Sequence, residues 1–138
     1  MPATGVQANW AAVSFNSTPI KRVTNVTFDR GGSTTAFRGD TDVYPTVIAS
    51  LAQNPGCTIT TADVAALMGI ADGASGTITA THKDARAATG GDVVYVLSNA
   101  VFETASANGP QGAFGTVQAS FKAYSTDGTT NPLAFTRA

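Results

Sequence analysis

The stretch that decides the fold is Asp92-Val-Val-Tyr-Val-Leu-Ser-Asn-Ala-Val-Phe-Glu103, followed after a Gly/Pro turn by Gly115-Thr-Val-Gln-Ala-Ser-Phe-Lys-Ala-Tyr-Ser125. The first run is largely apolar, which predicts a strand buried on both faces over its first half. The second run alternates Val117, Ala119 and Phe121 with Gln118, Ser120 and Lys122, the period of a strand with one buried face. The dipeptide Asp127-Gly128 is typical of hairpin turns and predicts a closing strand at 133–136.

Other strands are expected at 13–15, 20–29 and 75–83. In the last of these, Ile78, Ala80 and His82 face one way, and the opposite face carries Thr77, Thr79, Thr81 and Lys83. The run 43–51 is open to two interpretations, because Pro45 suits the first position of a helix. Its β-branched and aromatic residues favour a strand, which is the interpretation we adopt.

One helix is expected at about 61–69. Thr60 is its predicted N-cap, with Asp63 placed to complete a capping box, and Val64, Leu67 and Met68 form one apolar stripe. A helix this short requires packing against a sheet. The sequence therefore predicts a mainly β fold, an antiparallel β-sandwich or half-barrel with one short flanking helix.

The 138 residues predict a single domain at 13–138, preceded by an N-terminal arm at 1–12 that is rich in small and polar residues. Trp10 lies in this arm, and the sequence leaves open whether it contacts a partner or the core of its own domain. A Gly-rich, polar loop is expected at about 30–41, a length that usually serves a function. Phe37 is an apolar residue in that loop with no role in turn chemistry.

Charged residues make up only 12% of the chain, and eight basic residues nearly balance nine acidic ones. This is about half the usual share for a soluble domain, so we expect neighbouring subunits to cover much of the surface. A neutral Thr/Ser surface on a monomer is the simpler alternative. No Lys/Arg cluster supports nucleic-acid binding, and no apolar run approaches the roughly 20 residues of a membrane span. A single cysteine excludes an internal disulfide and fits a reducing compartment.

No catalytic, cofactor-binding or metal-binding constellation is evident. His82 is the single histidine and Cys57 the single cysteine, and each is interpreted as a strand residue with a structural role. Asp40 and Asp42 resemble the start of a calcium loop but lack its later acidic and glycine positions. We therefore expect neither an enzyme nor a cofactor.

Several segments resemble a known family: Thr60-Thr-Ala-Asp-Val-Ala-Ala-Leu-Met-Gly69, Gly76-Thr-Ile-Thr-Ala-Thr-His-Lys-Asp-Ala85, Tyr95-Val-Leu-Ser-Asn-Ala-Val101, Gly112-Ala-Phe-Gly-Thr116 and Phe121-Lys-Ala-Tyr-Ser-Thr-Asp-Gly-Thr-Thr-Asn-Pro-Leu-Ala-Phe-Thr136. Together they resemble the major tail tube proteins of long, non-contractile-tailed bacteriophages and of related tail-like particles. The likeness covers roughly residues 20–136, and its C-terminal element is the most specific part.

The resemblance implies hexameric rings that stack into a hollow virion tail tube, assembled in the cytoplasm of the host bacterium. The partners it implies are other copies of the chain, a tape-measure protein and other tail proteins. DNA would pass through the lumen without specific binding. The resemblance places the inter-ring contacts in the loop at 30–41 and in the N-terminal arm at 1–12. The candidate residues are Trp10, Arg30, Gly31, Gly32, Phe37, Arg38 and Asp40. Two strand faces are candidates for the lumen: Thr79, Thr81 and Lys83, or Gln118, Ser120 and Lys122.

Two alternatives remain at this point. One is another tail component of the same fold class, a tail completion or distal tail protein that forms a single ring. The other is a carbohydrate-binding β-sandwich module. That module needs exposed aromatic residues in a row, whereas Trp10, Tyr44, Tyr95 and Tyr124 are dispersed along the sequence.

Overall fold

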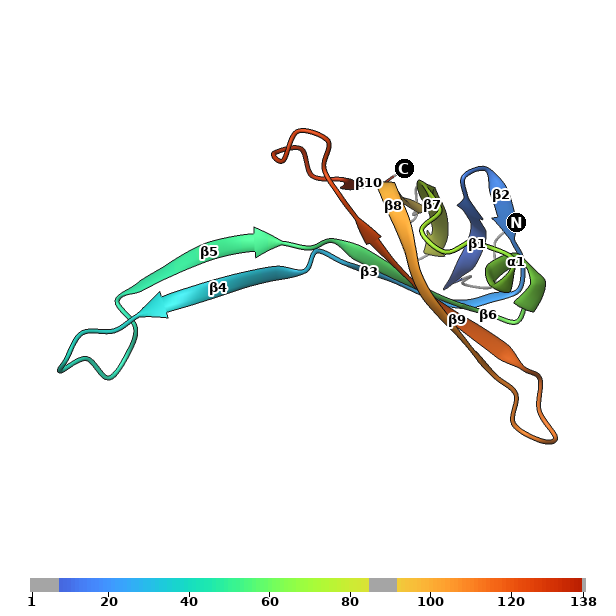
Figure 1. Ribbon diagram of the computed structural model, residues 1–138, viewed down its shortest axis with the longest axis horizontal. Helices are drawn as coiled ribbons and strands as arrows, with labels where there is room; N and C mark the ends of the chain where they lie inside the picture. Colours follow the sequence, from blue (N-terminus) through green and yellow to red (C-terminus); the bar gives the residue numbers. More distant parts are fainter. Residues whose placement is uncertain (1–7, 85–91, 138) are drawn as a thin grey trace, which may run out of the picture.

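The structure, a computed structural model, describes residues 8–84 and 92–137. These residues form ten strands and one short helix (Figure 1). In chain order the elements are β1 (Ala8–Phe15), β2 (Thr18–Ile20), β3 (Val23–Asp29), β4 (Gly32–Phe37), β5 (Val47–Gln53), β6 (Gly56–Thr61), α1 (Val64–Met68), β7 (Ser75–Asp84), β8 (Val93–Asn108), β9 (Thr116–Ala123) and β10 (Leu133–Arg137).

Eight strands form one antiparallel sheet in the order β2-β1-β7-β8-β9-β6-β3, with β10 also paired to β8. The sheet curls back on itself through the long strand β8. The N-terminal part of β8 pairs with β7 and β10, and its C-terminal part pairs with β9. Between the two parts Asn99 has a positive φ of 55°, a conformation that suits a local bend. The predicted β-sandwich or half-barrel with one flanking helix is thereby confirmed.

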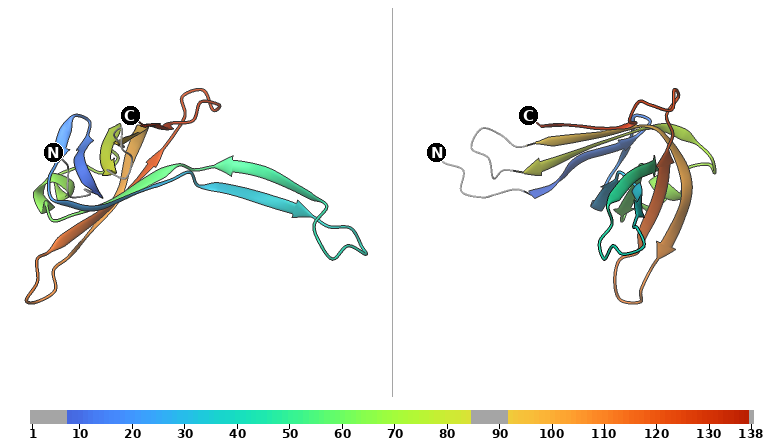
Figure 2. Two further views of the ribbon diagram at one scale, coloured as in Figure 1. Left: turned by 180° about the vertical axis from the view of Figure 1, so that it is seen from behind. Right: turned by 90° about the vertical axis from the view of Figure 1, so that its left-hand side faces the viewer.

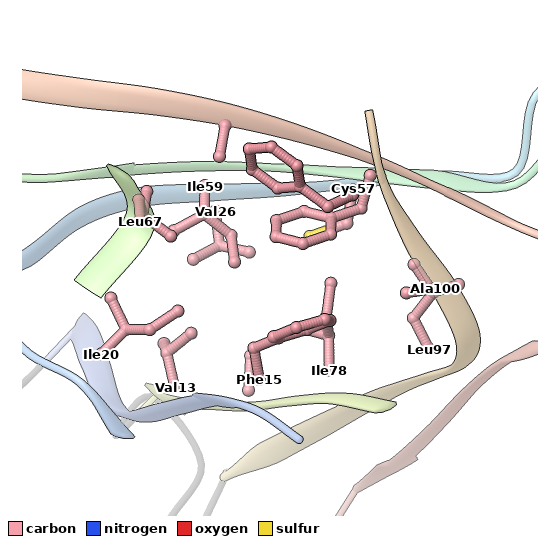
Figure 3. Packing of buried hydrophobic residues seen from close by; sticks show 14 of the residues in the cluster. Val13, Phe15, Ile20, Val26, Cys57, Ile59, Leu67, Ile78, Leu97 and Ala100 are labelled. Carbon is pink, nitrogen blue, oxygen red and sulfur yellow. The ribbon is translucent and has the colours of Figure 1, made fainter. Parts of the chain in front are cut away.

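The core lies between the two layers of the curled sheet (Figure 3). Val13 and Phe15 of β1 and Ile78 of β7 face Ile59 of β6 across it. The rings of Phe15 and Phe121 lie 5.1 Å apart. The predicted alternation in β7 and β9 is confirmed, because Ile78, Ala80, Val117, Ala119 and Phe121 are all buried.

The helix α1 is shorter than predicted. Thr60 lies in β6, so its predicted role as N-cap is wrong; the N-cap is Asp63, which makes no side-chain capping bond. The neighbouring hydroxyl of Thr61 instead accepts the N–H of Asp63 at 3.0 Å and donates to the carbonyl oxygen of Lys21. Leu67 anchors the helix with a fully buried side chain, and α1 contacts β2, β8 and β9.

The predicted hairpin between β9 and the closing strand is wrong. Both β9 and β10 pair with the same edge of β8, one after the other, and run in the same direction. The chain between them, 124–132, leaves that edge as a loop and returns to it. Tyr124 N–H donates to Asn99 O at 3.3 Å on one side of the loop, and Ser98 N–H donates to Pro132 O at 2.9 Å on the other.

The expected loop at 30–41 is wrong in its central part, since residues 32–37 form β4. β4 pairs with β5 in a separate two-stranded sheet, which projects far from the sandwich as a long hairpin (Figures 1 and 2). We call residues 32–53 the arm. The strand interpretation of 43–51 is confirmed only from Val47 onward, because 43–46 belong to the turn at the end of the arm.

Candidate assembly surfaces

His82 and Cys57, the single histidine and the single cysteine, lie on different strands. His82 lies in β7, edge-on to the Trp10 ring at 4.8 Å. Cys57 is buried in β6, and this burial raises the pKa of its thiol to about 12, which keeps it protonated and unreactive at neutral pH. Within 8–84 and 92–137, no three His, Cys, Asp or Glu side chains lie close enough to hold a metal ion.

The arm carries six of the eleven exposed large hydrophobic side chains of the described residues. Every residue of β4 and β5 is exposed, including Phe37 at 64% and Ile48 at 65%. Tyr44, in the turn, is 79% exposed. No charged residue occurs in β4 or β5. Large exposed apolar surfaces of this kind mark contact sites between proteins.

Both faces of the arm carry apolar side chains. Directly paired residues share a face, so Phe37 and Val47 lie together on one side and Ala36 and Ile48 on the other. Within the described chain, each arm strand pairs only with the other, which leaves both long edges without a hydrogen-bonding partner. Isolated two-stranded hairpins are marginally stable, so the arm needs a neighbour for stability.

A tight joint connects the arm to β3 and β6. Gly31 adopts a positive φ of 64° and approaches Asn54 closely. The Gly31 N–H donates to Asp29 Oδ1 at 2.9 Å, and the Asn54 N–H donates to Gly31 O at 3.0 Å. These bonds set the direction in which the arm leaves the sheet.

Hydrogen bonds among its own residues stabilise the turn at the end of the arm. The Thr46 N–H donates to Phe37 O at 2.9 Å, and the Gly39 N–H donates to Asp42 Oδ2 at 3.0 Å. Arg38 and Asp40 are both exposed in this turn. The structure thus gathers six of the seven inter-ring candidates, Arg30 through Asp40, into the arm and its joint.

Trp10, the seventh candidate, lies elsewhere. It belongs to β1 and packs with its own domain, 5.9 Å from the Tyr95 ring and 6.4 Å from the Phe28 ring. Phe28 stacks on Tyr95 at 5.0 Å. Residues 8–12 of the predicted N-terminal arm are therefore strand, and residues 1–7 lie outside the described residues. The aromatic rings pack against one another, which differs from the open row that a carbohydrate platform needs.

The two lumen candidates lie on the outer faces of different layers. Thr79 and Thr81 of β7 neighbour Val96 and Val94 of β8, so that face is mixed in polarity. Lys83 is exposed at the end of the same strand.

The face of β9 is polar throughout. Gln118 lies between Thr60 of β6 and Ser106 of β8, and Ser120 lies between Thr58 and Thr104. Lys122 lines a hollow of about 160 Å³ together with Asp29 and Glu103. Two acidic side chains therefore border the same hollow as the basic side chain of β9.

Two unpaired edges border the same polar layer. β3 is the last strand of the sheet order, so in the described part of the chain its outer edge has no hydrogen-bonded strand partner, although β1 lies close to β3. On the opposite side, β7 pairs with β8 only as far as Val101, and the Phe102 N–H donates to Ala74 O at 2.8 Å. Residues 103–108 of β8 have no strand on that side within the described ranges. Sequence patterns cannot reveal these edges, because they depend on long-range pairing.

No described helix has the length and apolar character needed to cross a membrane. Searches against models of known protein families and against curated proteins gave no match for this sequence.

Proposed function

We propose that the chain is a structural subunit that assembles with copies of itself into hexameric rings, which stack into the hollow tube of a phage tail. The observation that carries this proposal is the arm, a projecting hairpin whose apolar side chains and backbone edges are uncovered in the single chain. An arm of this kind acquires stability only by lying against a neighbour.

The free edges of the polar layer support ring closure. An edge strand is a template for pairing with another chain, and here one edge lies at β3 and the other at residues 103–108 of β8. Pairing of the first edge with the second edge of the next copy is a head-to-tail contact. Such contacts close into rings when the rotation between copies fits.

The polar face of β3, β6, β9 and β8 suits the wall of the lumen. Its side chains are mostly hydroxyls and amides, which carry no charge, and Lys122 lies beside Asp29 and Glu103. A wall of this composition offers DNA no cluster of cations to bind. Of the two candidates, Gln118, Ser120 and Lys122 are thus favoured over Thr79, Thr81 and Lys83.

The resemblance of residues 20–136 to tail tube proteins extends the proposal to partners and location. The partners are the other copies in the tube, a tape-measure protein during assembly and the tail proteins at each end. DNA passes through the finished tube without specific binding. The location is the virion tail, after assembly in the host bacterial cytoplasm.

Shortening the arm tests this proposal. Gly32 and Gln53 pair at the base of the arm, so replacing 33–52 with Asn-Gly gives a two-residue hairpin turn at that position. We expect sedimentation velocity to show large assemblies for the full chain and small species for the shortened one. Equal thermal unfolding midpoints at a concentration too low for assembly would show that the sandwich itself is unchanged. Unaltered assembly by the shortened chain would refute the role of the arm.

A single-ring tail component is the second candidate function. Sedimentation velocity of the full chain over a concentration series separates it from a tube subunit. Rings that never stack at any concentration favour it over the tube.

A further inference from the structure

The turn between β8 and β9 ends in an exposed aromatic residue. Phe114 is 91% exposed, the highest value among the large apolar side chains of the described structure. The turn comprises 109–115 and contains no charged residue. The Ala113 N–H donates to Pro110 O at 3.3 Å, and Gly112 adopts a positive φ of 84°. We call this segment the β8–β9 tip.

A groove lies at the other end of the same layer. It measures about 600 Å³ and separates the base of the arm from the 124–132 loop. Leu51 and Pro55 line one wall, and Tyr124, Thr129 and Pro132 line the other. No lining residue carries a charged side chain. The volume exceeds that of a phenylalanine side chain, and Tyr124, at 50% exposure, offers it an aromatic contact.

The loop wall of the groove is preorganised by Asp127. Its carboxylate accepts the Thr130 hydroxyl at 2.6 Å, the Thr129 and Thr130 N–H groups at 2.8 Å each, and the Ser125 hydroxyl at 2.8 Å. Both ends of the loop are hydrogen-bonded to β8 at Ser98 and Asn99. A wall fixed before contact loses little conformational entropy when a partner binds.

The tip and the 124–132 loop, which forms one wall of the groove, lie at opposite ends of β9, as Figure 1 shows. β9 begins beside the tip at Thr116 and ends at the groove at Ala123. A knob at one end and a matching groove at the other can join identical copies head to tail. Such a contact produces an open filament when the rotation between copies does not close a ring.

We propose that Phe114 of one copy docks in the groove between the arm base and the 124–132 loop of a second copy in the adjacent ring. This inference rests on the proposed function, because it assigns a contact between stacked rings. The absence of charge on both surfaces favours this pairing, since neither side has to desolvate an ion. It adds a contact at the base of the arm, where Leu51 lines the groove, to the contacts expected along the rest of the arm.

Substitution of the knob tests whether stacking depends on it. We expect Phe114→Ser to raise the concentration at which rings stack by about tenfold or more, because burying a phenylalanine contributes strongly to association. Gln111→Ser, in the same exposed turn, is the matched control and should stack as the unaltered chain does. Phe114→Leu should retain most of the stacking. Tubes that form equally well with Phe114→Ser would overturn the inference.

Cross-linking between two singly substituted chains identifies the site directly. Chains carrying Phe114→Cys and Thr129→Cys are mixed, assembled and treated with a short bismaleimide, to which the buried Cys57 should stay inert. A covalent dimer that forms in the mixture, and with neither chain alone, supports the contact. A dimer of Phe114→Cys with itself would mean that tips meet tips, which overturns it.

The two proposals fail in different ways. Tubes that assemble from the mixture without a cross-link overturn the Phe114 contact and leave the tube proposal standing. An unsubstituted chain that stays monomeric at every concentration overturns both.

Discussion

The N–H of Asn54 donates to the carbonyl oxygen of Gly31 at 3.0 Å, at the point where the arm leaves the sandwich. A Cβ atom at Gly31 would lie 2.0 Å from the carbonyl oxygen of Asn54. The two backbones therefore meet only because residue 31 has no side chain. This contact fixes where the arm points, and the direction of the arm decides which neighbour it reaches.

Gly31→Ala should accordingly disturb assembly more than folding. The substituted residue is strained at positive φ and clashes with backbone that has no freedom to move aside. We expect assembly to fall sharply in sedimentation velocity while the far-UV circular dichroism of the sandwich stays native. Gly32→Ala is the matched control, because a Cβ at Gly32 meets no atom within 4 Å. Equal assembly by both variants would contradict this account of the joint.

Polar substitution on the arm should separate assembly from stability. Phe37→Ser and Val47→Ser change neighbouring residues on one exposed face, so the free energy of unfolding of the monomer should change by no more than about 0.5 kcal/mol. Assembly should nevertheless be lost, because the face that a neighbour covers is no longer apolar. Chemical denaturation and electron microscopy of the same preparations measure the two effects. Thr34→Ser, on the opposite face, is the control.

Leu67→Ala should destabilise the sandwich by about 2–5 kcal/mol, since the side chain is fully buried beneath α1 and its removal leaves a cavity. Met68→Ala, one residue further along, should cost much less because Met68 is half exposed. Urea denaturation of both variants gives the comparison. Similar losses at the two positions would mean that α1 packs through a different face.

The 124–132 loop should keep its form to unusually low pH. Hydrogen bonds from the Thr130 hydroxyl, the Thr130 and Thr129 amides and the Ser125 hydroxyl hold the pKa of Asp127 well below its usual range. Because the folded pKa is depressed, the contribution is present above the ordinary aspartate pKa of about 3.9 and is lost only as pH falls through the lower folded value. Hydrogen exchange of the Thr129 and Thr130 amides as a function of pH measures how long the carboxylate of Asp127 keeps the loop in place.

Asp127→Ala should abolish the protection of the Thr129 and Thr130 amides against hydrogen exchange at every pH. It should also weaken stacking, because the groove loses its fixed wall. Asp72→Ala, at an exposed position outside the groove, serves as the control. Protection that is the same in the two variants would contradict the role given to the carboxylate.

Alternating patterns predicted most of the sandwich. Ile78 and Ala80 in β7, and Val117, Ala119 and Phe121 in β9, alternate with polar residues and are buried, so composition and period indicate these strands and their inner faces. The start of α1 was misplaced because Thr60 is needed as a strand residue in β6, and pairing with β9 overrides its capping propensity. The role of β10 was missed because Asp127-Gly128 organises a loop that returns to the edge of β8.

The candidate surfaces were predicted less completely. Phe37 stood out as an apolar residue in an expected loop, but its partner Val47 lies ten residues away in β5, and Gly32 pairs with Gln53, twenty-one residues away. Neither pairing leaves a local signal in the sequence. The sequence around Trp10 does not indicate its contacts with Phe28 and Tyr95, because these residues belong to strands far away in the sequence. The free edge at 103–108 follows only from where β7 ends, which no pattern within β8 records.

Negative-stain electron microscopy of the purified chain over a concentration series tests the central claim most directly. The account predicts six-fold rings that stack, or hollow tubes of uniform width that lengthen as concentration rises. A monodisperse monomer at every concentration would contradict it, since the arm and both sheet edges would then remain uncovered in solution.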